Sequence, residues 1–148
     1  MSKQSIPVVS LKDYTDGTPA QRAAFIDTVG AALVDLGFFA LEDHGVQQGL
    51  VDYAYDCTRR FFDLEAATKE SYVIPGCRGQ RGLTRFGMEH AKDSQAADLK
   101  EFWQVGRDFS ESHPRFDATR RNPWPTQVVD FESTMMALFS ELDSVSQS

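Results

Sequence analysis

Apolar residues recur at helical spacing in three stretches of the chain, and each stretch predicts an amphipathic helix. The predicted helices cover residues 19–36, 46–62 and 126–143. Their apolar stripes are Ile26, Val29, Leu33 and Leu36; Val46, Leu50, Tyr53, Ala54, Cys57 and Phe61; and Val128, Phe131, Met135, Leu138 and Leu142. Each stripe needs a surface to cover it, so the pattern predicts a folded core and not an extended polypeptide.

Local signals mark where helices begin and end. Thr18, Pro19 and Gln21 are typical of a capping box with proline at the first helical position. Gly37 stands where the C-terminus of a helix favours a residue with positive φ. Asp63 is expected to cap a short helix that runs to Lys69 or Glu70.

Short strands are predicted at residues 7–11, 38–42 and 101–106, and a turn at Tyr14 to Gly17. The run Phe38 to Leu41 is apolar at every position, which favours a strand buried on both faces. Helices and short strands together predict an α+β fold. The residues expected in its core are Leu33, Phe38, Leu41, Leu50 and Phe61.

Composition and charge limit the kinds of partner that this chain is expected to bind. The 148 residues fit a single domain, 41% of them are apolar, and the formal net charge is −7. A surplus of acidic residues argues against nucleic acid and against an anionic membrane surface as partners. No stretch has the roughly 20 apolar residues of a membrane span, and the N-terminus lacks a signal-peptide core. Cys57 and Cys77 are expected to be reduced thiols in a cytoplasmic protein, with a disulfide as the alternative.

Two loops separate the predicted elements. The loop 75–87 carries four glycines with arginines between them, a composition that could cradle an anion. The alternative is a surface connection without a ligand. The second loop, residues 108–125, is polar and interrupted by prolines.

Four motifs, in order along the chain, resemble the N-terminal region of the isopenicillin N synthase-like, Fe(II)- and 2-oxoglutarate-dependent oxygenases. The first is Gly37-Phe38-Phe39 followed by His44-Gly45-Val46. The others are Phe61-Phe62 with Lys69, the segment Asp98-Leu-Lys-Glu-Phe-Trp103, and Asn122-Pro-Trp-Pro125. The resemblance extends from Ile6 to about Leu142. Without it, Lys100 and Glu101 would be expected to form a solvated charge pair of little energetic value.

The resemblance implies a fold and a function. The helical region and its short strands would join a double-stranded β-helix, or jelly-roll, lying mostly beyond the end of this chain. The parent enzyme would use Fe(II) and 2-oxoglutarate to oxidise a small organic molecule. Because the family's glycine-containing loop lies at the active-site mouth, Arg81, Leu83 and Arg85 are the candidate substrate-binding residues. The family usually carries Tyr in place of Leu83 and Pro in place of Arg85.

The family's iron-binding His-x-Asp pair is missing from this chain, since none of His44, His90 and His113 begins one. No Arg-x-Ser motif for 2-oxoglutarate occurs either. Glu89, His90 and Asp93 could offer metal ligands, but a solvated polar loop is the favoured interpretation. We therefore expect no catalytic residue, no metal ligand and no bound cofactor here, and no activity from the chain alone.

Two functional hypotheses follow. The first is the N-terminal domain of an oxygenase, and the alternative is a free-standing, non-catalytic binding module derived from the same fold. In either case the strands near Ile6 to Leu11 and Phe102 to Val105 would present open edges. We expect such a chain either to associate with itself or to be marginally stable and prone to aggregate.

Overall fold

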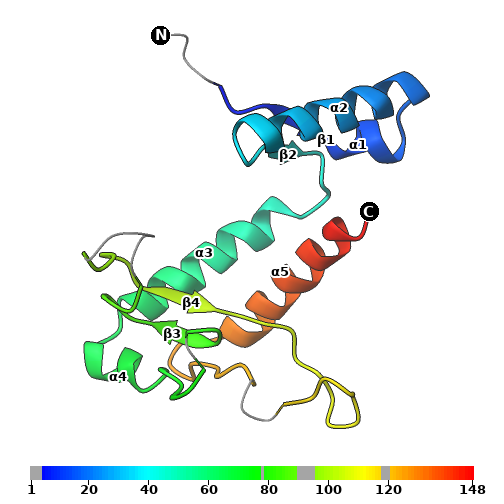
Figure 1. The fold of residues 1–148 in the computed structure, drawn as a ribbon. Coiled ribbons are helices and arrows are strands. Elements are labelled where there is room, and N and C mark those ends of the chain that lie inside the picture. The colour runs from blue at the N-terminus through cyan, green and yellow to red at the C-terminus, as the bar shows by residue number, and fades with distance from the viewer. Residues whose placement is uncertain (1–4, 78, 90–95, 118–120) are drawn as a thin grey trace. The chain divides into compact units, whose positions relative to one another are not determined.

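The structure is a computed structural model that describes residues 5–77, 79–89, 96–117 and 121–148 (Figure 1). Its elements are, in order, β1 (Val8–Ser10), α1 (Leu11–Thr15), α2 (Pro19–Asp35), β2 (Ala40–Glu42), α3 (Gln48–Phe62), α4 (Ala66–Glu70), β3 (Gly82–Thr84), β4 (Phe102–Gln104) and α5 (Phe131–Ser146). This mixture of helices and short strands is the predicted α+β class. None of the described helices is both long and apolar enough to cross a membrane.

Two compact units make up the structure. Unit 1 contains residues 1–47 and 141–148, and unit 2 contains residues 48–140. The single domain expected from the length of the chain stays a prediction.

Unit 1 is built on two parallel strands. β1 pairs with β2 in a register that places Val9 opposite Leu41. The capping box at the start of α2 is confirmed: Thr18 accepts from the backbone N–H of Gln21 at 3.3 Å, and Gln21 accepts from the backbone N–H of Thr18 at 3.0 Å. The predicted turn at Tyr14 to Gly17 begins too early, because the short helix α1 runs from Leu11 to Thr15 and the turn follows it at Asp16 and Gly17.

The expected core of this unit is wrong in part. Phe38 is 53% exposed and Leu33 is 51% exposed, whereas Leu41 is half-buried. A strand is buried on both faces only when other elements cover both faces of its sheet, and the two-stranded sheet of unit 1 is not covered in this way. The buried hydrophobic residues in the described part of unit 1 are small ones, Val9, Ala32 and Val46.

Unit 2 contains an antiparallel strand pair that sequence analysis only half predicted. β4 falls inside the predicted strand 101–106, but its partner β3 lies within the glycine-rich loop 75–87. The register places Leu83 opposite Trp103. Gly82 allows this close pairing: its φ is +69°, and a Cβ there would collide with the backbone carbonyl of Tyr72 and the ring of Pro123.

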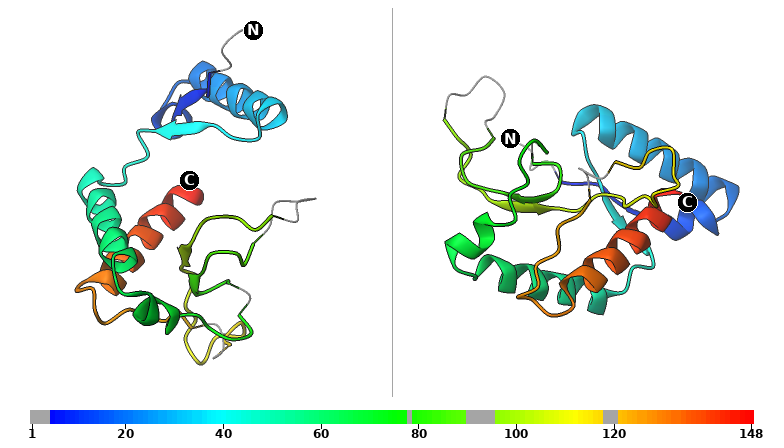
Figure 2. Two further views of the ribbon diagram at one scale, coloured as in Figure 1. Left: turned by 90° about the vertical axis from the view of Figure 1, so that its left-hand side faces the viewer. Right: turned by 90° about the horizontal axis from the view of Figure 1, so that it is seen from below.

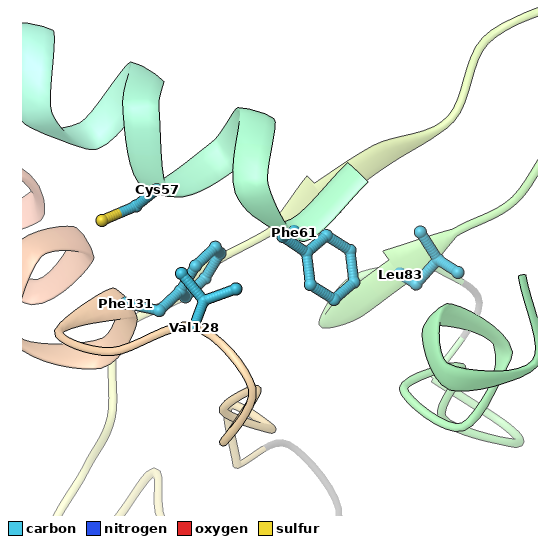
Figure 3. Close-up of a cluster of buried hydrophobic side chains, with 5 residues drawn as sticks. All are labelled: Cys57, Phe61, Leu83, Val128 and Phe131. Carbon is cyan, nitrogen blue, oxygen red and sulfur yellow. The ribbon is translucent and has the colours of Figure 1, made fainter. Parts of the chain in front are cut away.

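The core of unit 2 surrounds Phe61, as predicted (Figure 3). In Figure 3 its ring lies between Leu83 on one side and Val128 with Phe131 on the other. The rings of Phe61 and Trp103 meet edge-on at 4.6 Å between centroids, and those of Trp103 and Phe131 at 5.2 Å. Figure 2 shows α3 running beside the part of α5 that belongs to this unit. Leu50, also expected in the core, is half-buried.

Helix boundaries differ from prediction at two places. α5 begins at Phe131 and not at residue 126, because the preceding residues form turns and Asp130 has a φ of +63°. Val128 is nevertheless buried, so the apolar stripe correctly predicted the burial of this side chain, although the backbone there forms a turn and not a helix. Asp63 does not cap α4: the N-cap position is Glu65, and it makes no side-chain capping bond.

Candidate functional site

The three candidate substrate-binding residues line one hollow of unit 2. Its volume is about 590 Å³, and its wall includes Arg81, Leu83 and Arg85. Apolar side chains of Val73, Ile74 and Met88 complete much of the lining. The glycine-rich loop is therefore not a simple surface connection, because its β3 segment forms a wall of this hollow.

Each of the three residues has a different environment. Leu83 is 2% exposed and contributes mainly to the core. Arg85 donates from Nη1 to Glu70 Oε2 at 2.9 Å, and both side chains are about half exposed. Arg81 donates to the carbonyl of Gln80 at 2.6 Å, and its guanidinium covers Gly106 so closely that a Cβ at that position would require the arginine side chain to move. Of the three, the two arginines present charge at the rim, and Leu83 presents only its apolar surface.

An ion pair that sequence analysis missed joins α4 to β4. Lys69 Nζ lies 2.7 Å from Glu101 Oε1, and the two side chains are only 14% and 17% exposed. Lys69 also lies over the ring of Phe62, 5.7 Å from its centroid. The alternative considered without the resemblance, a solvated pair of Lys100 with Glu101, is not found, since Glu101 instead pairs with Lys69. The available signal was that both residues belong to motifs of the family resemblance.

Lys100 points toward other carboxylates. Its ammonium lies 2.9 Å from Asp98 and 3.2 Å from Glu89. Hydrogen bonds to Asp98 and then to Glu89 raise the pKa of Lys100 above its usual value. The side chain of Lys100 is about half exposed, so these contacts add little to the stability of the fold.

Asn122 closes the base of the second loop. Its side-chain amide donates to the carbonyl of Gly106 at 2.7 Å and accepts from the N–H of Gly106 at 2.9 Å. Asn122 is 8% exposed, and its backbone N–H lies 3.4 Å from Asp108 Oδ1. The asparagine of the Asn-Pro-Trp-Pro motif therefore pairs with the backbone just beyond β4, as a neighbouring strand would.

Each histidine in the described part of the chain accepts a hydrogen bond from the backbone N–H two residues further along. His44 Nδ1 accepts from the N–H of Val46 at 3.1 Å, and His113 Nδ1 accepts from the N–H of Arg115 at 3.0 Å. No three His, Cys, Asp or Glu side chains among residues 5–77, 79–89, 96–117 and 121–148 are placed to hold a metal ion. The donor set described here thus does not fit iron. His90 and Asp93, considered above as ligands, lie outside the described residues.

Known proteins are similar to this chain in sequence and in the arrangement of helices and strands. The family described as "non-haem dioxygenase in morphine synthesis N-terminal" matches residues 6–127. The chain belongs to this family. The match confirms the predicted resemblance to the N-terminal region of non-haem dioxygenases.

Similar proteins agree with the dioxygenase family. Validamycin A dioxygenase of Streptomyces hygroscopicus subsp. limoneus is 28% identical over 95% of this chain and 40% of its own length. The 2-oxoglutarate-dependent dioxygenase caaD of Aspergillus niger is 30% identical over 86% of this chain and 40% of its own length. This chain thus spans about 40% of the length of the curated relatives that it matches.

Solved structures support the same fold. A 2OG-Fe(II) oxygenase family protein of Caulobacter crescentus superposes with a TM-score of 0.77 at 32% identity, over 97% of this chain and 46% of that one. A Neurospora crassa protein in complex with alpha-KG and thymine gives a TM-score of 0.74 at 21% identity, over 95% of this chain and 44% of that one. The second likeness concerns the fold alone.

Proposed function

We propose that this chain is the N-terminal part of an Fe(II)- and 2-oxoglutarate-dependent dioxygenase that oxidises a small organic substrate. The observation that carries the proposal is the family match over residues 6–127. The name of one relative, a validamycin A dioxygenase, supports a small organic molecule as the substrate class. Iron and 2-oxoglutarate would be held by a jelly-roll outside this chain.

The role proposed for unit 2 is to form part of the substrate entrance. The hollow beside β3 has the mixture expected of such a site: apolar side chains for the body of a ligand and two arginines for orientation. Arg85 is tied to Glu70 and Arg81 to the backbone, which limits the freedom lost when a ligand binds.

The test is kinetic and needs the longer protein. We expect Arg81→Ala and Arg85→Ala to raise KM about tenfold with little change in kcat, because contacts made equally in ground and transition states act on KM. Arg59→Ala is the matched control, since Arg59 is an exposed arginine on α3 that pairs with Asp56. An unchanged KM in both rim variants would exclude the proposed entrance.

The alternative, a non-catalytic binding module, has one supporting observation. Unit 2 closes a core of its own, in which Cys57, Phe61 and Phe131 are at most 1% exposed. The reading frame after Ser148 separates the two proposals. A continuation that contains His-x-Asp favours the oxygenase, and a stop codon favours the module.

A further inference from the structure

A second hollow of unit 2 concentrates positive charge. Its volume is about 270 Å³, and the charged side chains in its lining are Arg81, Arg107, Arg115, Arg121, Asp108 and Asp117. Arginines outnumber aspartates by two in this lining, and one positive charge remains in excess when Glu111, which pairs with Arg121, is counted as well, although the chain as a whole has a net charge of −7. Such a local reversal of sign would attract an anion.

Several contacts hold this charge in place. Arg121 pairs with Glu111 at 2.9 Å and lies 5.3 Å from the centroid of Phe116. The guanidinium of Arg107 lies 6.0 Å from the ring centroid of Phe139 on α5. These contacts restrain the long side chains, so less conformational freedom remains to be lost on binding.

The backbone around the hollow is restrained as well. Asn122 bonds to both backbone groups of Gly106, so the two ends of the segment that carries Arg107 to Arg121 are fastened together. Arg81 approaches from the opposite side, with its guanidinium over Gly106. Arg81 also lines the larger hollow beside Leu83, and is the residue that the two hollows share.

We propose that this arginine hollow binds an oxyanion, the carboxylate or phosphate group of a small organic molecule. Guanidinium groups present paired N–H donors that match the spacing of two oxygens on such a group. Because Arg81 borders both hollows, the organic part of the same molecule would lie along Val73, Leu83 and Met88. Resting on the proposed function, this identifies the substrate class as organic acids or phosphate esters.

The test is calorimetric titration of the 148-residue chain at constant ionic strength, with malonate as the carboxylate probe and inorganic phosphate as the other. We expect at least one probe to saturate a single site with a Kd of about 1 mM or tighter. Saturation by malonate alone would identify a carboxylate ligand, and saturation by phosphate alone a phosphate ester. Absence of saturation by either probe at about 10 mM would overturn the proposal.

Variants locate the site. Arg115→Gln should weaken binding about tenfold, and Arg107→Gln serves as the second variant if the first fails to fold. Arg59→Gln, on exposed α3, should leave the Kd unchanged. If Arg59→Gln weakens binding as much as Arg115→Gln, the attraction is diffuse and the site is disproved. The titration needs neither iron nor 2-oxoglutarate, so its failure leaves the proposed oxygenase function standing, and loss of that function would not affect the titration.

Discussion

Replacing Phe61 by alanine should be among the most destabilising single changes in unit 2. The side chain is fully buried, and its ring contacts those of Phe62, Tyr72, Trp103 and Phe131 at centroid distances of 4.6 to 5.9 Å. Removing a buried phenylalanine side chain costs about 3–5 kcal/mol, from lost transfer free energy and the cavity left behind. The dense aromatic contacts place this residue at the upper end of that range.

Such a loss is a large share of a typical domain stability of about 5–15 kcal/mol. The matched control is Phe86→Ala, which removes the same side chain in the same unit from a position that is 57% exposed. Less than about 1 kcal/mol is expected there, because most of that ring already contacts water.

Urea unfolding followed by tryptophan fluorescence is a suitable assay, since Trp103 and Trp124 both pack against this core. The midpoint should fall sharply for Phe61→Ala at an unchanged denaturant slope, and hardly at all for Phe86→Ala. Equal losses in the two variants would refute the core described here.

Three further outcomes are expected. Lys69→Met should lower the free energy of unfolding by about 2 kcal/mol, measured in urea, because it leaves the carboxylate of Glu101 without its partner. Adding Glu101→Leu should restore part of that loss, and a loss that doubles in the double variant would contradict a coupled pair. Asn122→Ala should speed hydrogen exchange at the N–H of Gly106, and an unchanged rate would show that the amide does not anchor the loop. The chain alone should self-associate and bind a dye specific for apolar surface, given large exposed side chains such as Phe38 and Val34; light scattering that finds a dye-free monomer would oppose this.

The features predicted best from the sequence are those that depend on residues close to one another along the chain. The start of α2 at Pro19 follows from the Thr18 capping box, and the course of α3 from its strongly periodic apolar stripe. These signals act within one or two turns of backbone, so they can be identified without knowledge of the tertiary fold.

Features that depend on distant partners were missed. β3 was missed because β4 pairs with it from about twenty residues away, and the three-residue strand lies among glycines and arginines that do not favour strands. Phe38 has the composition of a core residue, but its burial depends on what covers the sheet. The start of α5 was misplaced because a buried Val128 continues the apolar stripe through a turn.

The candidate site shows the same division. The resemblance of the loop 75–87 to the family's active-site loop indicated Arg81 and Arg85, and the structure places them with Leu83 on one hollow. The second hollow was not predicted, because its arginines come from segments that are separate in the sequence. Arg81 precedes β3, and the other three arginines follow β4. The Lys69–Glu101 pair likewise joins residues 32 positions apart.

Succinate formation tests the central claim most directly. The chain alone and the protein encoded by its full reading frame would each be incubated with Fe(II), 2-oxoglutarate and oxygen, and the succinate formed would be quantified. The proposed function predicts Fe(II)-dependent succinate from the full reading frame and none from residues 1–148 alone. Succinate from the 148-residue chain alone, or none from a full-length protein that contains His-x-Asp, would contradict it.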